Sequence, residues 1–305
     1  MYIQNLNSLM HKKLFLTGSS GFIGKILIAF FSKDFEISTY QRDSEVTINE
    51  NIVIHLAGKA HDFKINSNPE EFLQANTELT KKVFDAFLYS DAKVFITLSS
   101  VKAVADQVNG RLYEEHTADP ITHYGKSKLL AENYILGKVI PDGKRVYILR
   151  PCMIHGPGNK GNLNLLYRFV SKGIVWPLGA FENKRSFCSI DNLIFIIKEL
   201  IEREDISSGI YNVADDLPLS TNEVISILAE SQEKKLSIWN VPKGLIQFVA
   251  KLGNVLKLPL NEERLEKLTE SYIVSNNKIL LALGKPLPIS SKDGLMKTFR
   301  SFLNG

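Results

Sequence analysis

The chain has 305 residues, of which 44% are hydrophobic and 23% charged, which excludes a disordered or fibrous protein and predicts a main domain with a smaller lobe. The formal net charge of +4 is too small to indicate a nucleic-acid partner. No apolar run approaches the roughly 20 residues that cross a bilayer.

The N-terminus has no basic segment followed by an apolar stretch and a small-residue cleavage site, so no secretory signal is predicted. Met10 is a second candidate start, which would leave residues 1–9 as an extension. Cys152 and Cys188 have no metal-ligand spacing and are expected to be reduced thiols. We therefore expect a cytoplasmic protein with no metal site and no membrane insertion.

Strand-forming apolar runs alternate with helical patterns through the first two thirds of the chain. After the first run, Ile23, Ile26, Leu27 and Phe30 recur at helical spacing and predict one apolar helix face. The alternation is typical of a doubly wound parallel sheet of the Rossmann type, with helices on both faces. The expected strands are 14–16, 36–40, 52–56, 94–98, 146–149 and 211–214.

The segment 17–24, Thr-Gly-Ser-Ser-Gly-Phe-Ile-Gly, follows the first expected strand and opens a helix. In that context Gly18 permits a tight turn, Gly21 lets backbone N–H groups approach a pyrophosphate, and Gly24 allows close packing of the helix on the strand. The sequence therefore predicts a dinucleotide site, to which Ser20, Phe22 and Ile23 would also contribute.

Gln41, Arg42 and Asp43 follow the second expected strand. An acidic residue at this place binds the ribose hydroxyls of NAD, whereas an arginine accommodates the extra phosphate of NADP. Arg42 favours NADP slightly, and Asp43 leaves NAD open.

Tyr124 and Lys128 are one helical turn apart, so their side chains are expected on one face. A free tyrosine, with a pKa of about 10, is a poor base at neutral pH, but an adjacent ammonium and a cationic nicotinamide both favour the phenolate. Such a tyrosine can exchange a proton with a substrate hydroxyl while the carbon beneath exchanges hydride with the cofactor.

After Pro151 the chain becomes rich in Gly, Pro and Asn, and its last third is helical. We expect a dinucleotide-binding domain from 10–160 plus 185–214, and a C-terminal substrate lobe from 161–184 plus 215–305. The amphipathic stretch 245–256 is expected to be a packed helix of that lobe rather than a membrane or partner helix.

Residues 13–214 resemble the extended short-chain dehydrogenase/reductase family, also called the NAD-dependent epimerase/dehydratase family. The spacing of the glycines and the order of the later motifs carry the resemblance. These motifs are His55-Leu56-Ala57-Gly58, Asn76, Ser99-Ser100, Tyr124-Gly125-Lys126-Ser127-Lys128, Arg150-Pro151, His155-Gly156-Pro157-Gly158, Arg185 with Asp191, and Tyr211-Asn212-Val213.

The resemblance implies a role for each matching residue. Ser100, rather than Ser99 or Val101, would hold the substrate oxygen against Tyr124, and Lys128 would also bind the nicotinamide ribose. Arg185 would clamp the substrate diphosphate, consistent with its forked donors. Asn162 or Asn164 would lie near the diphosphate and uracil, or would instead cap a loop. The remaining cofactor residues would be Leu56, Ala57, Gly58, Asn76 and Pro151.

Val101 and Lys102 stand where the family's 4,6-dehydratases have Asp and Glu, and a valine has no proton to give. The resemblance therefore implies an enzyme that epimerises or reduces C4 of a UDP-hexose for surface polysaccharide synthesis. It further implies a homodimer formed through the helices that include Tyr124. The alternatives are a non-catalytic NAD(P)-binding sensor or scaffold, and a reductase of non-sugar ketones, which would not need Arg185.

Overall fold

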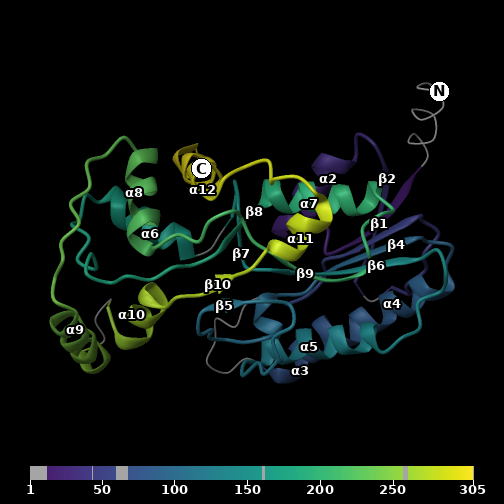
Figure 1. The fold of residues 1–305 in the computed structure, drawn as a ribbon, viewed down its shortest axis with the longest axis horizontal. Coiled ribbons are helices and arrows are strands. Elements are labelled where there is room, and N and C mark those ends of the chain that lie inside the picture. Colours follow the sequence, from purple (N-terminus) through teal and green to yellow (C-terminus); the bar gives the residue numbers. More distant parts are fainter. Residues whose placement is uncertain (1–11, 43, 60–67, 160–161, 257–259, 305) are drawn as a thin grey trace.

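The computed structural model describes residues 12–304 except position 43 and the segments 60–67, 160–161 and 257–259. The expected N-terminal extension and Asp43 thus lie outside the described residues. Figure 1 shows a sheet domain at one end of the molecule and a mainly helical lobe at the other.

Six parallel strands form the central sheet, in the spatial order β2-β1-β3-β4-β6-β9. Each run predicted from the sequence lies within one of these strands or overlaps it to within two residues. The predicted doubly wound α/β fold is confirmed. The strands are β1 (Lys13–Thr17), β2 (Glu36–Thr39), β3 (Ile52–His55), β4 (Val94–Leu98), β6 (Arg145–Pro151) and β9 (Gly209–Val213).

The strand order reverses between β1 and β3. The chain leaves β1 for β2 on one side, and then crosses through residues 40–51 to β3 on the other side. In open α/β sheets, ligands bind outside the carboxyl ends of the strands at such a reversal. The topology therefore places the expected dinucleotide site between the loops that follow β1 and β3.

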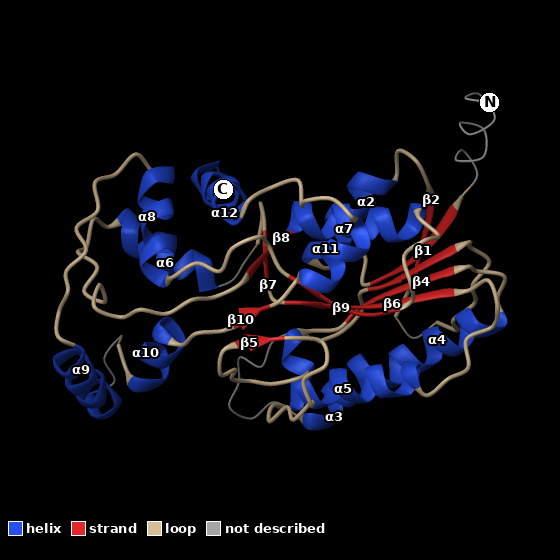
Figure 2. Ribbon diagram, viewed as in Figure 1, coloured by secondary structure: helices blue, strands red, loops and turns tan. Residues whose placement is uncertain are grey.

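Helices cover both faces of the sheet (Figures 1 and 2). On one face lie α2 (Phe22–Phe31), α7 (Ile190–Glu202) and α11 (Asn277–Leu283), and on the other lie α3 (Pro69–Phe72), α4 (Leu79–Tyr89) and α5 (His123–Leu136). A π-helical segment, Leu73–Glu78, joins α3 to α4. Each face therefore has its own apolar core, as expected for a three-layer fold.

The buried face of α2 differs from the prediction. Phe30 is 40% exposed and Phe31 is 1% exposed, so Phe31 rather than Phe30 enters the core. The buried positions are Gly24, Leu27 and Phe31. The buried face of α2 is rotated because Gly24 lets the helix backbone pack directly against the turn that contains Gly18.

The second lobe has a separate apolar core that includes Trp176, Leu228 and Phe299. Two short strand pairs lie between the central sheet and the lobe (Figure 2): β7 (Met153–His155) with β8 (Phe187–Ser189), and β5 (Arg111–Leu112) with β10 (Ile273–Val274). The helices of the lobe are α6 (Asn162–Ser171), α8 (Thr221–Ser231), α9 (Lys243–Leu256), α10 (Glu262–Thr269) and α12 (Ser291–Ser301).

Part of the expected lobe packs with the sheet instead. Tyr272, Val274, Ile279 and Leu283 belong to the same buried cluster as the central strands. We therefore assign the segment that contains β10 and α11 to the sheet domain, although the sequence division placed 215–305 wholly in the lobe.

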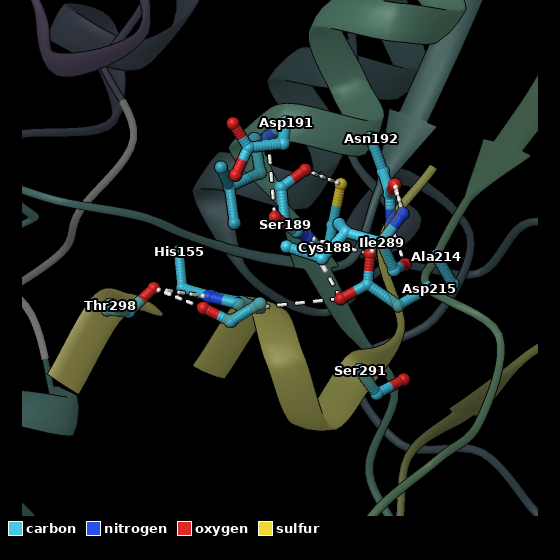
Figure 3. A network of polar contacts seen from close by, with 12 residues as sticks. His155, Cys188, Ser189, Asp191, Asn192, Ala214, Asp215, Ile289, Ser291 and Thr298 are labelled. Atoms are coloured by element: carbon cyan, nitrogen blue, oxygen red, sulfur yellow. Dashed lines mark hydrogen bonds and ion pairs between the residues drawn. The ribbon is translucent and has the colours of Figure 1, made fainter. Parts of the chain in front are cut away.

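A buried polar network fastens the two parts together (Figure 3). Asp215, just after β9, accepts hydrogen bonds from the Ser189 N–H at 2.8 Å and from Asn192 Nδ2 at 2.6 Å. His155 Nε2 lies 3.4 Å from Asp215, and His155 Nδ1 lies 2.9 Å from the Thr298 hydroxyl of α12. His155 thus has a structural role at the junction.

Candidate active site

The turn after β1 fits against the loop after β3 with no space for additional atoms. Gly18 has a φ of +72°, and a Cβ there would lie 2.8 Å from the backbone nitrogen of Ala57. A Cβ on Gly24 would lie 2.2 Å from the carbonyl oxygen of Gly18. Both positions therefore require glycine, for the turn and for the close packing predicted from the sequence.

The N-terminus of α2 is open to a ligand. Gly21 is its N-cap, with no side-chain cap, and the first turn has no acidic residue. Ser20 and Gly21 are exposed, whereas Phe22 and Ile23 are half-buried. The first N–H groups of a helix have no partner within the helix and lie at its positive end, so this terminus suits a pyrophosphate.

The loop after β3 is held by a chain of hydrogen bonds below it. The Thr17 hydroxyl accepts the N–H groups of Leu56 and Ala57 at 3.1 and 3.0 Å, and it lies 2.8 Å from His55 Nδ1. His55 Nε2 contacts the Thr80 hydroxyl at 2.9 Å. Burial, followed by the charge of Lys128, lowers the pKa of His55 to about 3, so the ring is neutral.

Asn76 joins this loop to α5. Its Oδ1 accepts the Lys59 N–H at 2.7 Å, and its Nδ2 donates to the Lys59 carbonyl at 3.1 Å and to the Ser127 hydroxyl at 2.9 Å. A Cβ on Gly58 would lie 2.6 Å from Asn76 Oδ1 and 3.2 Å from Lys128 Nζ. The backbone of the loop therefore lies directly beside the Lys128 ammonium.

We expect Gly58→Ala to weaken NAD(P)H binding at least about tenfold and to lower stability by about 1–3 kcal/mol, because the new methyl group displaces Asn76 or Lys128. Cofactor fluorescence titration and urea unfolding measure the two effects. Gly244→Ala is the matched control, since a Cβ at Gly244 meets nothing within 4 Å. Equal affinity in the two variants would contradict the expectation.

Arg42 lies beyond the end of β2 and is exposed. The Tyr40 N–H donates to the Leu16 carbonyl at 2.9 Å, which keeps this end of β2 beside the turn after β1. The guanidinium is therefore near the expected adenosine side of the site, where it could receive a phosphate.

The start of α5 brings Tyr124 close to the turn that contains Ser100. The Thr122 hydroxyl caps the helix by accepting the Gly125 N–H at 3.1 Å. A Cβ on Gly125 would lie 2.4 Å from the Lys102 carbonyl, so the helix start rests on the 3₁₀ turn Val101–Ala103. Ser100 caps that turn, accepting the Lys102 N–H at 3.2 Å.

Tyr124 is half-buried, and its ring packs edge-on against Phe72 at 6.5 Å between centroids. Burial raises the pKa of Tyr124, and a side-chain hydrogen bond with Ser100 opposes that rise. In the protein alone the phenol is therefore protonated at neutral pH. The expectation that Lys128 lowers the pKa of Tyr124 is not met in the ligand-free chain, where only burial and the Ser100 hydrogen bond shift this pKa and burial has the larger effect.

Lys128, one helical turn after Tyr124, is buried, and its Nζ donates to the Leu98 carbonyl at the end of β4 at 2.9 Å. Burial lowers the pKa of Lys128 from its ordinary 10.5 to about 8, and Glu132 acts in the opposite direction. Between pH 8 and pH 10.5, Lys128 is protonated in the unfolded chain and neutral in the folded chain. The free-energy cost of burying the charged ammonium is therefore present in full below pH 8 and disappears as the pH rises towards 10.5.

We expect Lys128→Met to abolish activity and to raise the free energy of unfolding at pH 7 by about 1–3 kcal/mol, because a charge no longer has to be buried. The gain should shrink above pH 8. Urea unfolding at pH 7 and at about pH 9.5 measures it. Lys126→Met, an exposed position in the same helix, is the control, and a less stable Lys128→Met at pH 7 would contradict the account.

A buried ion pair behind the site was not predicted from the sequence. Arg150 donates to Glu132 through Nε at 2.9 Å and Nη2 at 2.6 Å, and the Ser99 hydroxyl also donates to Glu132. Ser99 is therefore engaged away from Tyr124, which leaves Ser100 as the serine that faces the phenol. The only signal in the sequence was the Arg-Pro pair at the end of β6.

On the expected substrate side, Arg185 is bound to Glu270, a residue that no motif of the sequence indicates. Arg185 Nη2 donates to the Glu270 carboxylate at 3.1 Å, and Nε donates to the Glu270 carbonyl at 3.2 Å. The Tyr272 hydroxyl donates to the Ala105 carbonyl at 2.7 Å and lies 3.2 Å from the Val101 carbonyl. The Lys102 ammonium lies over the Tyr272 ring, 4.2 Å from the ring centroid. Tyr272 thus connects the arginine segment to the turn after Ser100.

Other predicted residues lie in the structure as follows. Asn164 Nδ2 donates to the Asn159 carbonyl at 3.0 Å, which supports the loop-capping alternative. The side chain of Asn162 lies outside the described part of the structure. Pro151 is buried at the end of β6. Cys152 and Cys188 are free and buried, and burial raises the pKa of both thiols.

Within the described residues, no three His, Cys, Asp or Glu side chains gather as metal ligands, and no helix is long and apolar enough to cross a bilayer. The polar groups that the structure gathers at the strand reversal are the open helix terminus, the loop after β3, and the group Ser100, Tyr124 and Lys128. This arrangement can bind a dinucleotide and move a proton beside it.

Comparison with known proteins agrees with this geometry. A sequence model of the NAD dependent epimerase/dehydratase family matches residues 46–214. The UDP-glucose 4-epimerase of Vibrio cholerae is 28% identical over 322 aligned residues, which cover 96% of each chain. The N-acetyl-alpha-D-glucosaminyl-diphospho-ditrans,octacis-undecaprenol 4-epimerase of Escherichia coli O157:H7 is 27% identical and covers 77% of each chain.

The fold also matches solved structures. The structure of RMD from Pseudomonas aeruginosa complexed with NADPH superposes with a TM-score of 0.72 and 22% identity, over 95% of this chain and 99% of that one. The likeness extends through the lobe, beyond the region that the family model matches.

Proposed function

Because the chain belongs to the NAD-dependent epimerase/dehydratase family, we propose that it acts at C4 of a UDP-linked hexose, either epimerising the hydroxyl or reducing a 4-keto group. It is an NAD(P)-dependent enzyme of sugar-nucleotide chemistry. The observation that carries the proposal is the juxtaposition of Ser100, Tyr124 and a buried Lys128 ammonium beside the loop after β3.

The proposed chemistry assigns one task to each side chain. The bound nicotinamide supplies or accepts the hydride at the sugar carbon. Tyr124 Oη gives a proton to, or takes one from, the oxygen on that carbon, and Ser100 Oγ holds this oxygen by a hydrogen bond. The Lys128 ammonium favours the phenolate form of Tyr124 once the substrate oxygen is in place.

The cofactor is NAD or NADP. The family description names NAD, and the similar Pseudomonas structure contains NADPH. The glycine turn and the open terminus of α2 would hold the pyrophosphate, and Leu56, Ala57 and Gly58 would line the site through their backbone. We retain a slight preference for NADP, supported by the exposed Arg42 beyond β2.

We propose that Arg185 binds the substrate diphosphate through its forked donors. Glu270 occupies part of that fork in the ligand-free protein, so the diphosphate would displace a carboxylate that is already paired with Arg185. The Vibrio relative acts on a UDP-sugar and the Escherichia relative on a polyprenyl diphosphate sugar, and both substrates contain this diphosphate. The similarity to the second relative supports a role in polysaccharide precursor synthesis.

Elimination of water across C5 and C6 is not part of the proposal. Val101 is buried in the core beside Ser100 and has no group that transfers a proton. Lys102, the next residue, directs its ammonium to the Asp106 carbonyl at 2.5 Å. Neither residue supplies the pair of acids that a 4,6-dehydratase needs.

The experiment that tests the proposal supplies UDP-N-acetylglucosamine and UDP-glucose without cofactor and, separately, a UDP-4-keto-6-deoxyhexosamine with NADPH. Interconversion of C4 epimers without added cofactor supports the epimerase, and NADPH consumption with the keto sugar supports the reductase. Binding of NAD(P) with neither reaction would instead favour the sensor or scaffold, and reduction of a steroid or flavonoid ketone would favour the non-sugar reductase.

We further propose that the protein is a homodimer that pairs through α4 and α5. Tyr89 at the end of α4 and Leu130 and Leu136 on α5 are exposed, and α5 carries Tyr124. Exposed apolar residues on two neighbouring helices suit burial against a second copy. Sedimentation velocity tests this, and a monomer would overturn it.

A further inference from the structure

Helix α9 buries only a narrow stripe of its surface. Among the side chains of α9 that the structure describes, Ile246, Ala250 and Gly253 are buried, and a Cβ on Gly253 would lie 1.9 Å from the Leu260 carbonyl oxygen. This close contact fastens the helix to the chain that leads into α10. The sequence prediction of a packed lobe helix is therefore correct for one side of α9 only.

The opposite side of α9 is apolar and exposed. Its residues follow one helical stripe and are between 37% and 63% exposed. A monomeric soluble protein rarely exposes such a continuous apolar stripe without a partner. The stripe, hereafter the α9 face, consists of Leu245, Phe248, Val249, Leu252 and Leu256.

The α9 face lies at an extremity of the molecule. Figure 1 shows α9 at the end of the lobe farthest from the central sheet, with α10 between it and the rest of the fold. The preceding segment adds Trp239, which is 61% exposed and whose backbone N–H donates to the Trp176 carbonyl at 2.8 Å. A partner with an extended flat surface could contact α9 without contacting the sheet domain.

The surroundings of the α9 face are basic. Between residues 231 and 260 the sequence has five lysines and one glutamate. Lys235, Lys243 and Lys251 are exposed, and in the described part of the structure no acid lies within ion-pair distance of them. Lys243 lies 5.8 Å from the Phe181 ring.

The acids of the neighbouring α10 are already engaged. Glu262 accepts from Asn254 at 2.5 Å, Glu263 pairs with Lys267 at 2.5 Å, and Glu266 accepts from Gln107 at 3.2 Å. None of these three glutamates lies within ion-pair distance of Lys235, Lys243 or Lys251, so in the described structure the three lysines keep their charge available to an outside partner.

We propose that the α9 face docks the protein on an anionic lipid bilayer, with α9 lying in the plane of the interface. An apolar stripe with Phe, Leu and a nearby Trp, bordered by lysines, is the pattern of helices that insert one face at a membrane surface. Anionic headgroups attract such lysines. A second copy of the chain fits less well, because pairing two α9 faces would bring the lysines of both copies together.

The test uses the full chain and vesicles of phosphatidylcholine with about one quarter phosphatidylglycerol, compared with phosphatidylcholine alone. We expect flotation with the anionic vesicles only, and loss of at least about tenfold in bound protein at high salt. Phe248→Glu with Leu252→Glu should abolish flotation. Leu281→Glu, at a position 82% exposed on α11, is the matched control and should float as the unaltered protein does.

Tryptophan fluorescence supplies a readout that does not depend on a variant. The chain has two tryptophans, and Trp176 is buried, so a spectral shift on adding vesicles reports Trp239. We expect a blue shift with anionic vesicles. No flotation and no shift would overturn the proposal, as would flotation by the double variant. Self-association abolished by the same double variant would also overturn it, by identifying a second copy as the occupant.

Discussion

We expect Tyr124→Phe to lower kcat/KM by about 10²–10⁴, the usual contribution of a positioned proton-transfer group. The substitution removes one oxygen atom and keeps the ring that packs on Phe72. Since that oxygen bonds only to Ser100 among the described side chains, the free energy of unfolding should change by less than about 1 kcal/mol. Steady-state kinetics and urea unfolding on the same preparation separate the two effects.

Tyr134→Phe is the matched control, because it removes a phenol oxygen from the same helix. The Tyr134 hydroxyl donates to Asp85 at 2.7 Å, on the side of α5 that packs towards α4. This variant should keep its activity and lose a small amount of stability. Full activity in Tyr124→Phe would remove the role assigned to the phenol, and equal losses in both variants would indicate a general effect on α5.

The second large effect is expected on stability. Arg150→Met leaves the Glu132 carboxylate buried without the charged hydrogen bonds that Arg150 donates to it, and we expect the free energy of unfolding to fall by about 3–5 kcal/mol. The carboxylate contacts Ser99 next to the proposed catalytic serine, so activity at low temperature should fall as well. Urea unfolding monitored by circular dichroism measures the loss.

The double variant Arg150→Met with Glu132→Leu distinguishes an unpaired charge from lost packing. Because it removes both charges, it should recover much of the stability lost in the single variant. A single variant that loses less than about 1 kcal/mol, or a double variant as unstable as the single one, would show that the buried pair does not hold β6 to α5.

The sheet could be predicted because its evidence is local. Each strand is a short apolar run, and the sequence between runs either repeats at helical spacing or contains glycine, so the alternation alone specifies a parallel sheet. The glycine turn and the spacing of Tyr124 and Lys128 are local in the same way. Contacts within one turn of a helix follow from its geometry.

What could not be predicted depends on contacts between distant segments. Phe31 lies in the core in place of Phe30 because α2 packs against the turn before it through Gly24. The spacing of apolar residues in the sequence does not reveal this packing. Glu270 reaches Arg185 across 85 positions of the sequence. The segment around Ile279 joins the sheet core for the same reason, since its apolar pattern would fit either domain.

Hydrogen-bond partners were also beyond the sequence. Asn164 had two roles open to it, and only the position of the Asn159 carbonyl favours loop capping. The resting state of Tyr124 depends on how deeply the phenol is buried, which the spacing of two residues does not reveal.

Transfer of deuterium from C4 is the most direct test of the central claim, that a nicotinamide exchanges hydride with C4 of a bound sugar while the Tyr124 phenol exchanges a proton with the oxygen on C4. With UDP-N-acetylglucosamine or UDP-glucose deuterated at C4, we predict slower turnover and retention of the label at C4 of the epimer. If the enzyme is a reductase, deuterated NADPH should deliver its label to C4 of the product. Release of the deuterium to water would contradict the account. So would equal turnover of labelled and unlabelled substrate in both the unaltered protein and Tyr124→Phe.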